Sequence, residues 1–276
     1  MKSSGLKFAL VLSCGLLAAA ANAAPKNNHI IYTPTKDGVN LNKAGAALVY
    51  HNGPTITTAH VVYLFWGPSF ASGGADNAYA TTLQAFRNQF GTTGEYKTIT
   101  QYSGIQLTNL AGGTADWFDT STPPNNVTDA IVQSHVNAYL STHTFDASAI
   151  YEVVIPSTSY SSSGTSTSCG GPSLAYCAYH SWIGSGTSAI KYSIQPWPGC
   201  SGCSVSGWSN VQNQEHFVCH ETREAVTDPT GQGWWDNRGY EADDKCAWSP
   251  TPFFGTGGYG YQYEWSNLTK TCIKTL

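Results

Sequence analysis

Hydrophobic positions along the chain change period several times, and each change predicts an element. Residues 60–66 (HVVYLFW) form a short apolar run that is rich in β-branched and aromatic residues and ends at Gly-Pro, which is typical of a buried strand. Residues 149–156 predict another strand, and residues 176–182 and 189–196 predict two paired strands. Residues 157–171 are nearly all Ser, Thr and Gly, and therefore predict a surface loop.

Helical spacing appears in three segments. Residues 77–91 and 127–143 repeat apolar side chains every three or four positions; the first ends at a glycine and the second follows a Pro-Pro pair. The helical period returns over residues 208–227 and stops at Asp228-Pro229, because a residue before proline avoids the helical region. Strands mixed with helices in this order predict a single α+β domain with a mixed sheet.

The N-terminus has the features of a secretory signal. Two lysines precede an apolar run over residues 8–21, and Ala-Asn-Ala at 21–23 is a small-residue cleavage site. The run is too short for a membrane anchor, and Cys14 follows a poor lipobox. We therefore expect a signal peptide over residues 1–23 and a secreted protein, extracellular or periplasmic, with no membrane span.

Composition narrows the class of partner. Charged residues make up 11% of the chain, against about 25% in soluble proteins generally, and the net charge is −4. Without a basic patch, nucleic acid is excluded as an expected partner. Residues 24–46 are polar and irregular and predict an extended arm, which leaves residues 47–276 as the domain.

Cysteine usage agrees with export. Of the eight cysteines, Cys14 lies in the predicted signal peptide, so seven remain, and most should be paired in an oxidising compartment. The odd count leaves one thiol, and Cys219 is the candidate because it lies within a helical pattern. The short Gly/Ser-rich segments and the position of the last cysteine predict three bridges: Cys169–Cys177, Cys200–Cys203 and Cys246–Cys272.

The segment from Cys219 to Trp248 carries the chemistry. It begins with His-Glu-x-x-Glu, one residue away from the His-Glu-x-x-His signature of zinc peptidases. His220 and Glu224 are four apart and share a helix face, so both can bind one metal ion. Glu221 is rotated about 100° from His220, which suits a general base beside a metal-activated water.

A catalytic zinc site needs a third protein ligand. The following segment supplies three acidic residues, Glu241, Asp243 and Asp244. One assignment makes Glu241 the ligand and Asp244 the acceptor that holds His220 in its tautomer. The swapped assignment, with Asp244 as ligand and Glu241 as support, stays open.

Two further histidines are candidates. His216 lies on the same helix face as His220 and either touches the site or lies on the helix surface. His180, in the predicted strand CAYHSW, could bind the metal, steady an oxyanion or be a satisfied core histidine. The alternative for the whole segment is a solvated charged face. A metal site is favoured because the chain's scarce carboxylates crowd here, in a tryptophan-rich, cysteine-anchored segment.

Four stretches together resemble a known family. They are LVYHNGPTITTAHVVYLFWG (48–67), ITQYSG (99–104), YCAYHSW (176–182) and HETREAVTDP followed by GWWDNRGYEADDKCAW. They resemble the phosphate-induced protein or EXORDIUM family and its bacterial secreted relatives, over about residues 47–250. Plant members of that family are associated with extracellular growth responses.

The resemblance bears on the site more than on the reaction. It implies that Glu224 is the usual residue at its position, and it favours Glu241 and Asp244 over Asp243. The chain departs from the family pattern in two ways. Cys219 and His216 lie ahead of the motif, and polar Asp243 and Lys245 lie within it.

The sequence favours a secreted, zincin-like metallohydrolase that holds Zn²⁺ and cleaves a peptide or protein, with Glu221 as base. One alternative is a non-enzymatic extracellular protein that binds cell-wall or surface components. Another is a disulfide-stapled structural domain without a site. Metal content and peptide cleavage separate the three.

Overall fold

A six-stranded mixed sheet organises the molecule. The computed structural model describes residues 30–38, 46–113 and 115–276, so the expected signal peptide lies outside the described residues. Strands β10, β6, β3 and β4 run parallel to one another, whereas β9 is antiparallel to both of its neighbours, β10 and β1. The strand order is β1 (Ile31–Pro34), β9 (Tyr176–Ile183), β10 (Ile190–Gln195), β6 (Ala149–Val154), β3 (His60–Trp66) and β4 (Trp117–Asp119).

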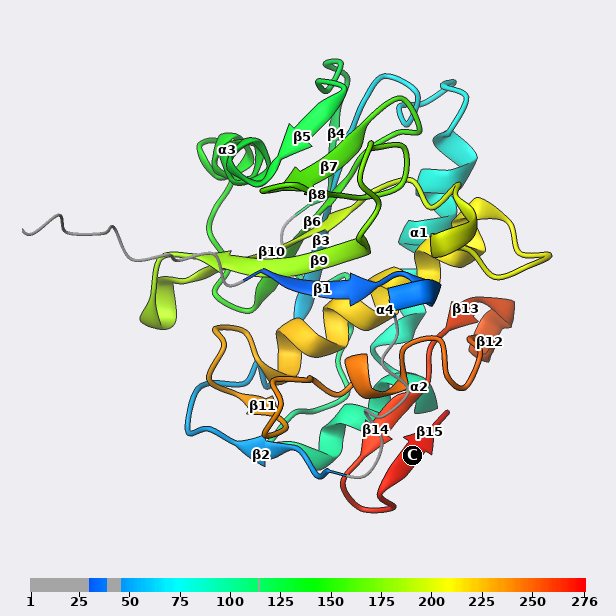
Figure 1. Ribbon diagram of the computed structural model, residues 1–276. Helices are drawn as coiled ribbons and strands as arrows, with labels where there is room; N and C mark the ends of the chain where they lie inside the picture. Colours follow the sequence, from blue (N-terminus) through cyan, green and yellow to red (C-terminus); the bar gives the residue numbers. More distant parts are fainter. Residues whose placement is uncertain (1–29, 39–45, 114) are drawn as a thin grey trace, which may run out of the picture.

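Helices cover both faces of this sheet (Figure 1). Helix α3 (Asp129–Leu140) lies on one face, and helices α1 (Asn77–Phe90) and α4 (Asn210–Thr227) lie on the other. Because side chains alternate along a strand, successive residues of β3 enter two different cores. The expected α+β class with a mixed sheet is confirmed.

Short elements complete the chain. Most of them lie below α4 in Figure 1, on the side away from the main sheet, with the C-terminus among them. They are β2 (Val49–Tyr50), α2 (Gly94–Lys97), β5 (Asn126–Thr128), β7 (Tyr160–Ser163), β8 (Ser166–Thr167), β11 (Trp234–Trp235), β12 (Phe253–Phe254), β13 (Gly260–Tyr261), β14 (Glu264–Ser266) and β15 (Thr271–Ile273), with 3₁₀ turns at Lys36–Gly38, Thr98–Gln101, Gly186–Ser188, Ser201–Cys203, Asp244–Cys246 and Thr256–Gly258.

Helix α4 is defined at both ends and buried along nearly all of its length. Its first turn has a capping box, in which Ser209 and Gln212 satisfy each other's backbone N–H groups. It ends at Asp228, whose backbone leaves the helical region before Pro229. All residues from Asn213 to Thr227 are buried, so the polar side chains on this helix must find partners inside the protein.

Most predicted elements are present within a few residues, and two regions differ. Residues 157–171 are not simply a loop, because they contain β7 and β8, which pair with each other, and the backbone N–H of Ser161 in β7 donates to the hydroxyl of Ser168 at 2.9 Å. The hydroxyl-rich composition hid this strand signal. Residues 31–34 of the predicted arm form β1, which pairs with β9 at the edge of the sheet.

Two of the three predicted disulfides are wrong. The bridges are Cys169–Cys200 and Cys177–Cys203, together with the predicted Cys246–Cys272, and Cys219 is a free, buried thiol as expected. Residues 200–203 turn beside β9, where the Cys177 sulfur lies 3.7 Å from the Gly202 carbonyl oxygen. Spacing alone could not show this approach, and the two long loops closed here constrain the unfolded chain more than local bridges would.

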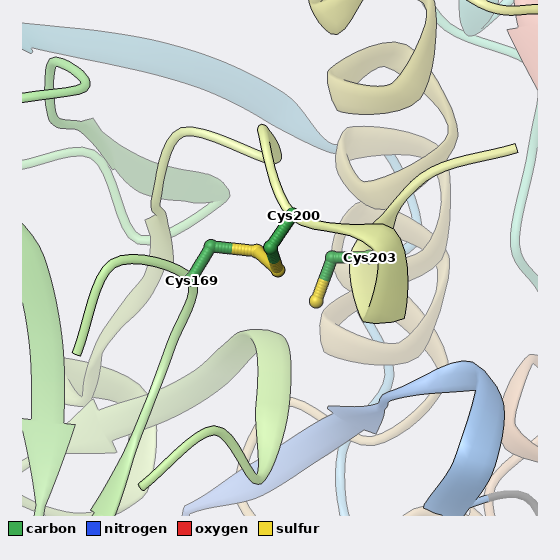
Figure 2. Close-up of side chains that lie close together, drawn as sticks. All are labelled: Cys169, Cys200 and Cys203. Atoms are coloured by element: carbon green, nitrogen blue, oxygen red, sulfur yellow. A yellow bond between two sulfur atoms is a disulfide. The ribbon is translucent and has the colours of Figure 1, made fainter. Parts of the chain in front are cut away.

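The cysteines also form a group that resembles a metal site. Figure 2 shows Cys203 beside the bridge between Cys169 and Cys200, and the three sulfurs lie within 4.8 Å of one another. Each sulfur is already in a disulfide, so no thiolate is left to bind a metal. Nowhere in the described ranges is there a helix long and apolar enough to cross a membrane.

Candidate metal centre

Helix α4 brings together the first two predicted ligands. His220 and Glu224 lie one turn apart, and His220 Nε2 is 3.0 Å from Glu224 Oε2. Both side chains are completely buried, so neither group is solvated by bulk water. The spacing in the sequence therefore produces the shared face that was predicted.

Strand β9 supplies a second imidazole. His180 Nε2 lies 3.8 Å from Glu241 Oε2, and its Nδ1 lies 3.8 Å from Glu224 Oε2. Glu241 comes from the segment after β11, on the far side of the site from the sheet. His180, one of the weaker sequence candidates, thus stands between two of the predicted carboxylate ligands.

Four buried ligand atoms in this region form no regular hydrogen bond, although two of them, His220 Nε2 and Glu224 Oε2, form the 3.0 Å ion pair described above. They are His180 Nε2, His220 Nε2, Glu224 Oε2 and Glu241 Oε2. Ligand atoms of His180, Glu224 and Glu241 all lie within 4.8 Å of one another, and so do those of His220, Glu224 and Asp244. Buried polar atoms are normally paired, so these two groups of ligand atoms, which share Glu224, could hold a metal ion.

Both imidazole rings are held through their other nitrogen. His220 Nδ1 is 3.1 Å from Gln262 Oε1, and the Gln262 amide nitrogen donates to the Asp243 carbonyl at 2.7 Å, which fixes the amide orientation. His180 Nδ1 donates to Glu221 Oε2 at 2.9 Å. In each ring this leaves Nε2 facing the carboxylates, and a neutral ring would offer the Nε2 lone pair to a metal there.

The observed partner of His220 Nδ1 is Gln262, where the first assignment placed Asp244. The backbone N–H of Asp244 donates to Glu224 Oε1 at 2.8 Å, and its carboxylate accepts a 3.4 Å bond from the Glu241 N–H. Gln262 takes the predicted supporting role, because the C-terminal segment packs against α4 at this turn. Asp244 itself remains close enough to His220 and Glu224 to serve as a ligand.

The electrostatics show an excess of negative charge. Burial, followed by repulsion from Asp228, Glu224 and Asp244, raises the pKa of Glu241 well above its ordinary value. Burial alone would lower the pKa of His220, but the facing carboxylates, Glu224 first, raise it to about 10. A bound cation would replace these protons and relieve the repulsion.

A neighbouring buried group also contains more carboxylates than cations, and burial, followed by Asp243, raises the pKa of Glu264 in it well above its ordinary value. Arg223 pairs with Asp243 and, through Nε at 2.9 Å, with Glu264, all three fully buried. Asp243 is therefore engaged away from the metal candidates, as the family resemblance implied. Glu264 was not predicted at all, because its place beside Arg223 depends on the C-terminal hairpin packing against α4.

His216 is neither on the helix surface nor among the ligand groups found in the described residues. Its ring is fully buried against Trp208, Phe217 and Trp248. Burial lowers the pKa of His216 to about 3, so the ring is neutral. The surface alternative is wrong because α4 is enclosed on all sides.

One hollow reaches the site from the surface. It has a volume of about 340 Å³, with Glu241 and Asp228 at its base and Trp182 and Trp235 among its walls. After burial, repulsion from Asp228 is the main cause of the raised pKa of Glu241, so the two carboxyl groups lie close together. Asp228 was predicted only as the residue that ends the helix, although its acidic side chain just after the motif was a usable signal.

Two imidazole nitrogens with two or three carboxylates form a donor set of intermediate hardness, suited to zinc and other divalent first-row ions. No family model matches this chain, and neither a curated protein nor a solved structure does. The site therefore stands on its own geometry.

Proposed function

We propose that this protein is a secreted, metal-dependent hydrolase that holds Zn²⁺ between α4, β9 and the segment after β11, and that it cleaves peptides or proteins. The observation that carries the proposal is the presence of two overlapping groups of buried ligand atoms, His180–Glu224–Glu241 and His220–Glu224–Asp244, beside a hollow lined by Glu241. An ion held at Glu224, which both groups share, would give these buried atoms a partner.

The residues present fit such an ion. His180, His220, Glu224 and Glu241 would hold it, with Asp244 as a further carboxylate, and Zn²⁺ would supply Lewis acidity and a more acidic water. Glu221 and Gln262 would keep the imidazole rings in the ligating tautomer. Trp182 and Trp235 would flank the substrate and limit the access of bulk water.

Glu221 has the predicted role of general base. One carboxylate oxygen accepts from His180 and the other accepts from the hydroxyl of Thr33. To take a proton from the attacking water, the carboxylate must exchange one of these partners, and the Thr33 hydroxyl can rotate away at least cost. Glu221 would thus both orient His180 and accept the proton.

A zincin-like arrangement and kinship with the EXORDIUM family are part of the same proposal. Support comes from the signature helix lying against a mixed sheet, with a further acidic candidate downstream of it. Three disulfides among the described residues support an extracellular location.

Metal analysis and peptide cleavage test the proposal. We expect about one equivalent of zinc per chain and cleavage of a peptide library by the parent protein. Glu221→Gln should keep the metal, because an amide oxygen still accepts from His180, and should lose cleavage. Glu215→Gln, a carboxylate change on the same helix away from the ligands, is the matched control and should retain both.

A second candidate function has one observation in its favour. Glu221 is completely buried and both of its oxygens are occupied, as suits a residue that only supports His180. The protein would then bind metal and a cell-wall or surface component without catalysis. Stoichiometric zinc with no cleavage by the parent would select this alternative, and absence of any bound metal would exclude both.

A further inference from the structure

Lys191 on β10 carries a buried ammonium that lacks an anionic partner. Its side chain is 5% exposed, and Nζ donates to the main-chain oxygens of Ala147 and of Ala189, the latter at 3.1 Å. No carboxylate of the described residues forms an ion pair with it, and the nearby Asp146 is bonded to His60 Nδ1 at 2.5 Å. An ammonium has three N–H donors, so one remains for a ligand.

A hollow of about 200 Å³ adjoins this ammonium. Hydroxyl-bearing residues dominate its lining, and no acidic residue lines it. The hydroxyl residues are Thr55, Thr57, Ser148, Thr187 and Thr230. A lysine beside hydroxyl-bearing residues is a chemical environment that suits an oxyanion, although the Thr55 hydroxyl already donates to the Ser103 carbonyl oxygen.

Shared wall residues link this hollow, through a second one, with the hollow at the metal centre. It shares Pro54, Gly186 and Thr230 with a larger hollow of about 420 Å³. That hollow in turn shares Trp182 with the one that reaches Glu241. We refer to these three neighbouring hollows as the groove; Trp182 is part of the wall of the second and of the third.

Trp182 is a fixed point along this groove. A side chain at Gly231 would lie 2.7 Å from Cη2 of the indole, so the ring is packed closely against the Gly231 backbone. Gly231 also has φ of +73°, which favours glycine. The close approach holds the indole in place between the two larger hollows.

The geometry of the strands gives the length of a ligand that would reach from the metal centre to Lys191. Lys191 is directly opposite Trp182 on β9, and Trp182 lies two residues from His180 on the same face. Two residues span roughly 7 Å along a strand, and neighbouring strands are about 4.8 Å apart. An extended chain would therefore place a group about two to four residues from the metal centre beside Lys191.

We propose that the hollow around Lys191 is a subsite for a carboxylate, carried by an extended ligand whose other end lies at the metal centre. Describing that ligand as a substrate rests on the proposed function, whereas the carboxylate subsite does not. A single lysine neutralises one negative charge, which matches a carboxylate better than a phosphate dianion.

A pair of small probes tests the subsite on the intact protein. Calorimetric titrations would compare N-acetylalanine, as its carboxylate, with N-acetylalanine amide, using parent protein with and without zinc. We expect the acid to bind about tenfold more tightly than the amide, since hydrogen bonds to charged groups are worth the most. Lys191→Met should remove this preference, and Lys97→Met, at an exposed lysine, should keep it.

Several results would overturn the proposal of a carboxylate subsite at Lys191. Equal binding of acid and amide by the parent, or no binding of the acid at tens of millimolar, overturns the proposal even if Lys191→Met fails to fold. Tighter binding of inorganic phosphate than of the acid overturns the carboxylate class. The titrations measure binding without cleavage and include protein without zinc. The subsite proposal can therefore be refuted while the hydrolase proposal is kept, and the hydrolase proposal can be refuted while the subsite proposal is kept.

Discussion

The two faces of the main sheet are built from different chemistry. The face toward α3 is covered by aliphatic and aromatic residues such as Val62, Leu64 and Val153. The face toward α4 also has an apolar core, but it includes the buried polar side chains of Glu152 and His180. Both faces exclude water, so the polar groups on the α4 face need partners from within the protein.

Polar groups on the α3 face largely have such partners. Asp129 Oδ1 accepts from the hydroxyls of Tyr179 and Tyr192, at 2.9 and 2.6 Å. His135 is an exception, since its Nε2 is unpaired and burial lowers its pKa to about 4, but the ring is stacked against Trp66. Unpaired atoms on the α4 side are more numerous, and four of them belong to candidate metal ligands, His180, His220, Glu224 and Glu241. The difference separates a face that stabilises the fold from a face arranged around a ligand.

The largest effect should come from the α3 face. Leu64→Ala removes a fully buried side chain between β3 and α3, and we expect it to lower the free energy of unfolding by about 3 kcal/mol. Zinc should not change that loss. Chemical denaturation with and without zinc measures it, and Leu107→Ala, at an exposed leucine, should cost less than about 0.5 kcal/mol. A zinc-dependent loss in Leu64→Ala would contradict the separation of the two faces.

Zinc should act on the α4 face alone. At a free concentration one hundred times the dissociation constant, it should raise the free energy of unfolding by about 2.7 kcal/mol. Glu224→Gln should abolish most of this gain, because an amide, which is a poor metal ligand, replaces a carboxylate that belongs to both groups of candidate ligands. Glu215→Gln should keep the gain; if Glu224→Gln keeps it too, Glu224 is not a ligand.

The pH dependence sharpens the contrast further. Burial raises the pKa of Glu152 from 4.5 to about 8, with the Thr222 hydroxyl bond opposing, and Glu152 Oε2 has no partner. The folded state therefore binds a proton that the unfolded chain releases, so this stability is full below pH 4.5 and is lost as pH rises to about 8.

Glu152→Gln should remove that loss. Between pH 5 and pH 8, the free energy of unfolding of the variant should fall by on the order of 2 kcal/mol less than that of the parent. Thermal unfolding at several pH values measures the slope. Glu215→Gln should act in the same direction with a smaller effect, since burial raises the pKa of Glu215 only to about 7. An unchanged slope in Glu152→Gln would mean that Glu152 does not titrate in this range.

Sequence reasoning succeeded where the information is local. The helical period over the signature placed His220 and Glu224 on one face, and the apolar runs marked β3 and β6. It failed where position depends on distant packing. The hydroxyl-rich composition of β7 hid a strand whose register is set by β5.

The contacts of the site that the sequence did not predict also depend on distant packing. His180 reaches Glu241 only because β9 lies against α4, and Gln262 reaches His220 only because the C-terminal segment returns to the same turn. Neither relation leaves a spacing signal in one sequence. The disulfides fail likewise, since Cys177 meets Cys203 through the path of β9.

The smallest expected effect concerns Gln262, the residue that holds His220. Gln262→Met keeps the side-chain length but removes the oxygen that accepts from His220 Nδ1. The ring is then free to rotate or to exchange tautomers, so we expect zinc affinity to fall about tenfold, the low end for lost supporting contacts to a metal ligand. Competition with a chromogenic chelator measures it, and Gln106→Met, at an exposed glutamine, is the control. Because the ligands themselves are untouched, zinc should still bind at one equivalent; unchanged affinity would show that the packing around α4 alone orients His220.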